Sequence, residues 1–136
     1  MRRRLLIIGS AAALIAALIL IQANRVPGPD LKIGGLYAVQ KDSDPSFSVA
    51  KVLALDEAVH VRVYRRRFSQ RPSGVDETTL QTASSFDPKA PAWDHIPISR
   101  SAFSAWKPKW LGQSSVSKDE LVGYFEWRKT GGGVWQ

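Results

Sequence analysis

The longest apolar run of the chain extends from Leu5 to Ile21 without an ionisable side chain, and three arginines at positions 2–4 precede it. Seventeen helical residues rise about 26 Å, close to the thickness of a hydrocarbon core, so the run predicts a membrane-spanning helix. The arginines on its N-terminal side orient the N-terminus toward the cytoplasm and the rest of the chain to the other side. We therefore expect a signal-anchor over residues 1–25, a Pro/Gly spacer over residues 26–31, and a domain over residues 32–136.

A cleaved secretory signal is the alternative interpretation of the same run. Its apolar core is usually shorter, about 7 to 15 residues, and the nearest cleavage-like site, Ile21-Gln22-Ala23, has a bulky residue where a small one is needed. The pattern favours an uncleaved anchor in a bacterial inner (cytoplasmic) membrane, with a periplasmic domain.

Three runs rich in β-formers follow, at residues 36–39, 47–55 and 59–64, separated by turn-forming residues. The third run alternates cleanly: valines at 59, 61 and 63 share one face, and His60, Arg62 and Tyr64 share the other. This pattern predicts a half-buried antiparallel strand. The second run offers two apolar faces, so it predicts either a bulge or burial on both sides.

The C-terminal half predicts one loop, two helices and one further strand. Residues 71–97 are rich in Ser, Thr, Pro and Asp without a sustained period, which is typical of a long surface loop. Ser99 is placed to cap a short helix that reaches Trp106, and residues 110–116 form the candidate strand.

The last helix, expected over residues 118–129, has signals at both ends. Ser117 and Glu120 have the spacing of a capping box, and Gly131 stands where a C-cap is expected. One face of this helix should pack on the sheet, and it contains Leu121, Tyr124 and Phe125.

Three segments within residues 33–64, Gly34-Gly-Leu-Tyr-Ala-Val, Ser48-Val-Ala-Lys-Val-Leu and Val59-His-Val-Arg-Val-Tyr, resemble the first three strands of an SH3-like or Tudor-like small barrel. Some small bacterial immunity proteins have a similar outline. The resemblance implies binding of proteins, peptides or cell-wall glycans rather than catalysis, with Tyr37, Phe47 and Tyr64 near a ligand groove. The expected fold is thus an N-terminal transmembrane helix followed by a mainly-β (α+β) small SH3-like barrel or meander sheet with a C-terminal helix.

Composition limits the chemistry. The chain has no cysteine, which excludes disulfides, thiol catalysis and Cys-based metal sites. Its formal charge of +7 suggests an anionic partner such as nucleic acid. Four cations belong to the predicted membrane segment, however, which leaves fifteen against twelve anions, or +3, for residues 26–136. No nucleic-acid partner is expected for a domain outside the cytoplasm.

Five arginines and two aromatic residues are concentrated in residues 62–71. Arginine binds carboxylates and phosphates with two parallel hydrogen bonds, so this segment is a candidate site for an acidic protein partner. The alternative is a solvated strand end that pairs with Asp76, Glu77 or Asp87. The candidate ligand-binding residues here are Arg62, Tyr64, Arg65, Arg66, Arg67 and Arg71.

The five tryptophans all lie in the last 44 residues. Trp106 and Trp110 are expected in the core, because a small domain needs large side chains to bury enough surface. Trp93, in the predicted loop, and Trp135, after three glycines, are less easily explained by packing. They complete the set of candidate contact residues.

Signals of catalysis are weak. Asp94-His95 near Ser99 and Ser101 allows a hydrolase on paper, but no nucleophile elbow accompanies it. The paired carboxylates at 56–57, 76–77 and 119–120 fit a turn, a solvated loop and a helix N-terminus. Asp42-Ser-Asp44 lacks the rest of a calcium loop, so no metal or cofactor is expected.

The sequence therefore predicts a non-catalytic, membrane-anchored extracytoplasmic protein-binding module. The alternatives are a toxin-neutralising immunity protein, a cell-wall glycan-binding module and, from a different class, a small hydrolase that uses His95.

Overall fold

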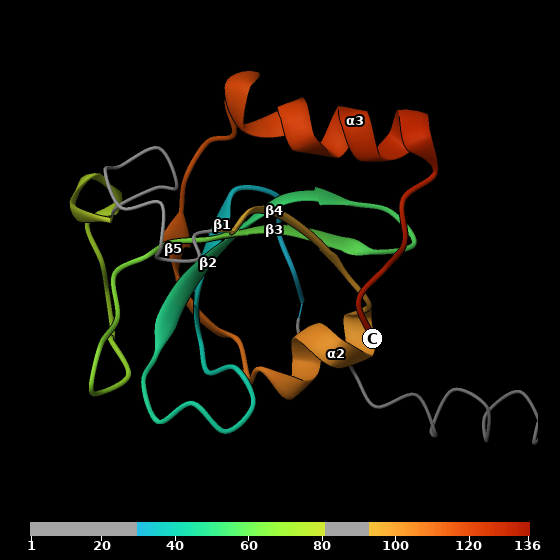
Figure 1. The fold of residues 1–136 in the computed structure, drawn as a ribbon. Coiled ribbons are helices and arrows are strands. Elements are labelled where there is room, and N and C mark those ends of the chain that lie inside the picture. The colour runs from blue at the N-terminus through green and yellow to red at the C-terminus, as the bar shows by residue number, and fades with distance from the viewer. Residues whose placement is uncertain (1–29, 81–92) are drawn as a thin grey trace, which may run out of the picture.

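The computed structural model describes residues 30–80 and 93–136, and these residues form a small α+β fold built on one antiparallel sheet of five strands. The predicted anchor at residues 1–25 lies outside the described residues. Within them, no helix is both long and apolar enough to cross a bilayer. The strands are β1 (Gly35–Val39), β2 (Ser48–Leu55), β3 (Val59–Val63), β4 (Trp93–Ile98) and β5 (Lys109–Gln113), in the spatial order β4-β3-β2-β1-β5 (Figure 1).

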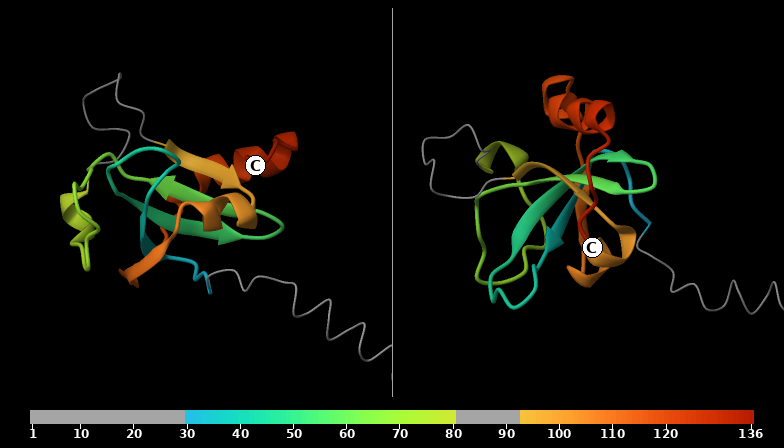
Figure 2. Two further views of the ribbon diagram at one scale, coloured as in Figure 1. Left: turned by 90° about the horizontal axis from the view of Figure 1, so that it is seen from below. Right: turned by 45° about the vertical axis from the view of Figure 1, so that its right-hand side comes forward.

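Two α-helices and two short 3₁₀ helices complete the fold. They are η1 (Glu77–Thr79), α2 (Arg100–Ala105), η2 (Asp119–Leu121) and α3 (Val122–Thr130). Figures 1 and 2 show α3 on one side of the sheet and α2 on the other, so that both faces are covered. The C-terminus lies beside α2 (Figure 1).

The larger core lies on the face that carries α2. Phe103 of α2 is fully buried there and makes an edge-to-face contact with Tyr37 of β1. Burial of such aromatic rings against branched aliphatic side chains supplies most of the driving force for a domain of this size. The other buried members of this cluster are Val39, Ala50, Val52, Val59, Val61, Val63, Ile96 and Ile98.

The opposite face of the sheet is also buried, although β3 alternates as a half-exposed strand would. His60 is fully buried and Tyr64 is 4% exposed, while the valines between them fill the larger core. In β2 the register shifts between Val52 and Ala54, which places Val49 and Leu55 on opposite faces. Both predictions for this strand, a bulge and burial on two sides, are confirmed.

The turn just before β1 contains a glycine, Gly34, that no other residue could replace without strain. Gly34 has φ +79°, and a Cβ at this position would lie 2.3 Å from the carbonyl oxygen of Ser114. The backbone of Gly34 also bonds Val52 and Ser114, which joins β1 to β2 and to the end of β5. The close approach of three segments therefore requires glycine.

The prediction of one long loop over residues 71–97 is wrong. β4 occupies residues 93–98, and η1 forms within the part expected to be irregular. The β4 segment was missed because its apolar residues are interrupted by His95 and Pro97. Pro97 is tolerated because β4 lies at the edge of the sheet.

The predicted helix that Ser99 caps is confirmed as α2. The Ser99 hydroxyl accepts a hydrogen bond from the Ala102 backbone N–H, and Trp106 forms the C-cap. Trp106 packs against the larger core, as expected. The prediction of a core role for Trp110 is wrong: β5 is an edge strand, so the Trp110 side chain is 44% exposed.

The signals of the last helix are confirmed, but its packing face only in part. Ser117 and Glu120 form the reciprocal capping box, and Gly131 ends the helix with φ 63°. The box begins the 3₁₀ helix η2, and α3 follows at Val122. The predicted face is confirmed in part: Tyr124 packs on His60, whereas Phe125 is 54% exposed, and Trp127, one turn after Tyr124, packs on His60 as well.

Candidate functional site

The arginine-rich segment does not present one continuous patch. Arg67 pairs with Asp44, Arg71 donates to the Lys107 carbonyl oxygen at 3.0 Å, and Arg66 donates to Thr79 Oγ1 at 2.8 Å. These partners belong to three different loops or turns. The expected partners Asp76 and Glu77 bind none of the three, and Asp87 lies outside the described residues. These contacts tie the loop after β3 to its neighbours.

Two arginines of this segment place their guanidinium groups over phenylalanine rings. The Arg66 guanidinium lies 4.8 Å from the Phe68 ring centroid, and the Arg71 guanidinium lies 4.9 Å from that of Phe47. Phe47 and Phe68 also pair through their backbones at 2.8 and 2.9 Å. These cation–π contacts hold the arginine stems against the protein.

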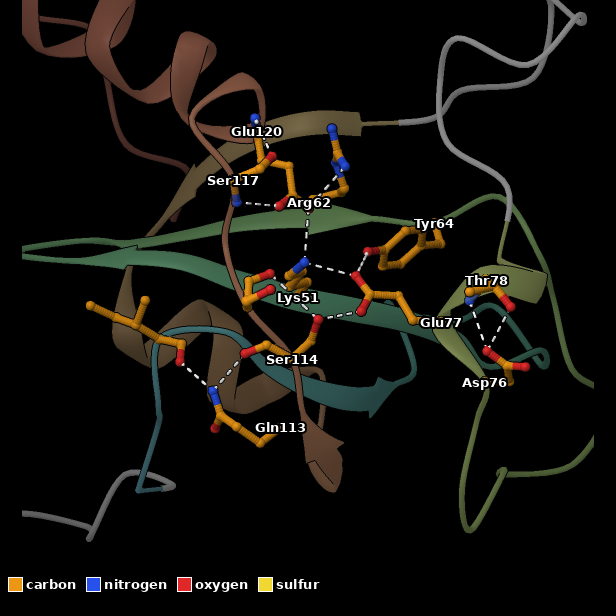
Figure 3. A network of polar contacts seen from close by, with 12 residues as sticks. Lys51, Arg62, Tyr64, Asp76, Glu77, Thr78, Gln113, Ser114, Ser117 and Glu120 are labelled. Atoms are coloured by element: carbon orange, nitrogen blue, oxygen red, sulfur yellow. Dashed lines mark hydrogen bonds and ion pairs between the residues drawn. The ribbon is translucent and has the colours of Figure 1, made fainter.

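Two predicted site residues, Arg62 and Tyr64, point into the molecule and join a buried network of charges (Figure 3). At its centre is Lys51 of β2, only 2% exposed, whose Nζ lies 2.7 Å from Glu77 and 2.9 Å from Glu120. Tyr64 donates to Glu77 at 2.9 Å, and Arg62 donates to Glu120 at 3.1 Å. Tyr64 is therefore not a surface contact residue, which corrects its place in a ligand groove; the same holds for Tyr37, 2% exposed.

The network keeps both glutamates ionised. Burial raises the pKa of Glu77, but hydrogen bonds from Lys51, Ser114 and Tyr64 outweigh this effect and lower the pKa below its ordinary value. Burial also raises the pKa of Glu120, and the Ser117 backbone, Lys51 and Arg62 together lower it. Because the two acids come from η1 and η2, Lys51 fastens both segments to the sheet. The interpretation of these carboxylates as a solvated loop and a helix terminus missed this role.

A second buried polar group lies beneath α3. Asp56 Oδ1 lies 2.8 Å from His60 Nε2, and His60 Nδ1 lies 2.9 Å from His95 Nε2. The two imidazole planes differ by only 5°, so the rings meet edge to edge. Tyr124 Oη donates to the second oxygen of Asp56 at 3.2 Å. Nothing in the sequence indicates that the two histidines meet, because only the pairing of β3 with β4 brings them together.

Among the hydrogen bonds of the described residues, His95 has no serine partner that could act as the nucleophile of a hydrolase. Ser99 caps α2, and its hydroxyl lies 3.2 Å from that of Ser101, while His95 Nε2 is engaged by His60. Among the described residues, no cluster of three or more His, Asp or Glu side chains is arranged to hold a metal ion. Asp42-Ser-Asp44 is a turn in which Ser46 and Arg67 hydrogen bonds lower the Asp44 pKa to about 2.

An apolar groove of about 590 Å³ lies on the α2 side. Its floor comes from β4 and α2, one rim comes from the turn at residues 41–45, and the other comes from the C-terminal residues. Trp135 is 60% exposed here although it is anchored through its backbone, which pairs with Pro97 and Ser99 at 2.8 and 2.7 Å. We call this hollow the Trp135 groove; its apolar lining residues are Ile96, Ile98, Ala102, Ala105, Trp106 and Trp135.

The Trp135 groove includes one of the two tryptophans that the sequence singled out. The other, Trp93, begins β4, where its backbone pairs with that of Val63. Comparison of the chain with protein-family models, with curated proteins and with solved structures finds no match.

Proposed function

We propose that this chain is a membrane-anchored extracytoplasmic module that binds a protein partner and catalyses no reaction. The observation that carries the proposal is the Trp135 groove, where two indoles flank an apolar floor. Exposed tryptophan beside a hollow is the usual composition of an anchor site in a protein interface. The apolar run at residues 5–21 supports the membrane anchor, and the excess of arginine before it supports the orientation.

We infer further that the sheet is an SH3-like small barrel. Strands β1 to β4 pair in sequence order, β5 returns to pair with β1, and α2 lies between β4 and β5. The strong twist and curl of the sheet, visible in both views of Figure 2, support the same inference. Small barrels of this kind commonly present loops and edges to a partner, which agrees with a binding role.

The groove favours a partner that inserts an apolar side chain rather than an acidic surface that docks on the arginines. Three of the candidate arginines already have partners within the domain, and Arg62 is bound to Glu120. A cell-wall glycan is the second candidate, because the face of an indole also stacks on a sugar ring. Both ligands would enter the same groove, so one experiment separates them.

The test is photo-crosslinking in living cells from a benzophenone amino acid placed at Trp135, with Phe125 as the matched control. Phe125 is exposed to a similar degree, 54% against 60%, but lies on α3, away from the groove. We expect one stoichiometric protein adduct from position 135, none from position 125, and loss of the adduct when Ala105→Glu places a charge in the groove. Equal adducts from both positions, or an adduct that persists with Ala105→Glu, would contradict the proposal.

One further variant and the chemical nature of the adduct separate the alternatives. Replacing Arg65, Arg66 and Arg67 together by alanine should leave the adduct at position 135 unchanged if the groove is the site. Loss of the adduct in this triple variant would favour the arginine segment. Muropeptides in place of a protein adduct would favour the glycan-binding module.

A further inference from the structure

The contact between the two histidines holds a single hydrogen. His60 Nδ1 and His95 Nε2 face each other at 2.9 Å in nearly coplanar rings, which is hydrogen-bond distance and leaves no room for two N–H groups pointing at each other. Ionised Asp56 accepts from His60 Nε2, so a neutral His60 offers the lone pair of Nδ1 to the His95 N–H. The pair therefore accommodates one added proton, shared next to Asp56, but not two.

His60 is fully buried and His95 is partly buried under α3, so loss of the contact between them would disturb the packing of that helix. The rings of Tyr124 and Trp127 each lie edge-on with centroids 4.6 Å from that of His60. The helix backbone is equally close, because a Cβ on Gly123 would lie only 2.8 Å from the Cβ of His95. Because Tyr124 and Trp127 pack near both rings, two cationic imidazoles that repel each other would push against α3.

The charged and titratable groups near the two histidines come from the β2–β3 turn, β3, β4, α2 and α3. Among the described residues, Asp56 is the one carboxylate in contact with either ring, so a second cationic imidazole has no counter-ion of its own. The nearby arginines bind other groups: Arg128 donates to the Tyr124 hydroxyl, and Arg100 donates to the Asp56 carbonyl oxygen. Arg62 pairs with Asp94 and Glu120.

Helix α3 is connected to the Trp135 groove through its own tail. Trp127 Nε1 donates to the Gly133 carbonyl oxygen at 2.9 Å, and the Gly132 N–H donates to the Trp127 carbonyl oxygen at 3.1 Å. The tail is thus folded against the same indole that packs on His60. Two residues further on, Trp135 forms a wall of the groove.

We propose that Asp56, His60 and His95 form a pH-sensitive latch, which holds α3 and residues 131–136 on the sheet while at most one of the two imidazoles is protonated. Protonation of both releases the helix and its tail and withdraws Trp135 from the groove. The effect on the groove rests on the proposed binding function, whereas the release of α3 does not.

The direction of the pH effect follows from the folded and released states. Burial and the neighbouring His60 lower the pKa of His95 to about 4 in the folded protein, against 6.5 for a solvated histidine. The released state therefore takes up the proton first as the pH falls below 6.5, and acid favours release. With these two values the equilibrium constant for opening rises about 30-fold between pH 7.5 and pH 5.0.

Hydrogen exchange of the full chain in detergent micelles tests the release, because it reports the opening equilibrium even when the open state is minor. After correction for the intrinsic pH dependence, we expect protection of peptides covering residues 122–136 to fall about 30-fold between pH 7.5 and pH 5.0, with β2 unchanged. The chain has only two histidines, and both are in the latch. His95→Gln keeps an N–H donor toward His60, but the glutamine does not titrate. In this variant the protection of residues 122–136 should change less than about threefold between pH 7.5 and pH 5.0.

Three results would overturn the latch: unchanged protection of α3, an equal loss in β2, or the full loss in His95→Gln. The wild-type imidazole resonances provide a check that needs no variant, since one histidine should titrate well below 6.5, and two ordinary titrations would refute the latch. Crosslinking from Trp135 repeated at both pH values tests the groove separately. If α3 opens while the yield of an established adduct stays constant, the latch stands and its control of the groove is refuted.

Discussion

Replacing Lys51 by methionine should destabilise the protein by removing the buried cation that holds two partly buried acids together. Methionine preserves most of the apolar stem and volume of lysine, so the loss is mainly electrostatic. Lys51 is 2% exposed, and its ammonium lies 2.7 Å from Glu77 and 2.9 Å from Glu120. Without it, two carboxylates face each other across the vacated position.

The size of the effect follows from this geometry. Two oxygens that both lie within 3 Å of one nitrogen are less than about 6 Å apart, and unit charges about 5 Å apart repel by about 3 kcal/mol at an effective dielectric constant of about 20. Arg62 and Tyr64 still bind one acid each, which offsets part of this repulsion. Breaking a buried charge cluster by removing one partner typically costs about 3 to 5 kcal/mol. We expect Lys51→Met to lower the free energy of unfolding by about 3 kcal/mol at pH 7.

The cost should depend on pH. In the native protein the pKa of both glutamates lies below its ordinary value, so their contribution is present above the ordinary carboxyl range and is lost as the pH falls through the lowered values. In Lys51→Met the repulsion raises the pKa of one carboxyl, which takes up a proton as the pH falls from 7 toward 5. The difference in the free energy of unfolding between the native protein and Lys51→Met should therefore shrink to about 1 kcal/mol near pH 5.

Urea unfolding of the full chain in detergent micelles, followed by tryptophan fluorescence and far-UV circular dichroism, measures these differences. Adding Glu77→Gln and Glu120→Gln to Lys51→Met removes the repelling charges and should recover at least half of the lost stability. A cost below about 1 kcal/mol at pH 7 would refute the reasoning, and so would a cost that does not change with pH.

Three further substitutions test the packing that positions the groove and the latch. Phe103→Ala empties the centre of the larger core and should lower the free energy of unfolding by about 3 to 5 kcal/mol, against less than about 1.5 kcal/mol for Phe103→Leu; urea midpoints that are equal for the two would contradict the burial. Gly34→Ala must place a Cβ 2.3 Å from a carbonyl oxygen at positive φ and should cost more than about 2 kcal/mol in the same assay, whereas Gly74→Ala, which has open space, should stay within about 0.5 kcal/mol. Gly123→Ala should push α3 away from His95 and lower the exchange protection of α3 at pH 7.5 as well as at pH 5.0; normal protection at pH 7.5 would show that the close approach is not tight.

Local signals in the sequence predicted the elements whose ends are defined by short-range hydrogen bonds. The capping box of Ser117 and Glu120, the left-handed Gly131 and the Ser99 cap are all confirmed, because each depends on residues within four positions of one another. The strand β4 escaped prediction since an edge position, which tolerates Pro97, cannot be read from the segment alone.

The site residues divide in the same way. The exposure of Trp135 was predicted, because a large aromatic after three glycines has little sequence context that could bury it. The inward position of Tyr64 was missed: alternation assigns a residue to a face, but whether that face is covered depends on η1 and η2, which are distant in sequence.

By itself, the sequence determined the first three strands, the two α-helices, the absence of thiol chemistry and the apolar segment that predicts an anchor, since each follows from residue types at short spacing. Only the tertiary structure decided which polar residues are buried. Lys51 meets acids 26 and 69 positions away, and His60 meets His95 35 positions away. Such pairs exist because the sheet places β3 beside β4 and is covered on both faces. A charge surrounded by low dielectric must find its partner there, however far along the chain that partner lies.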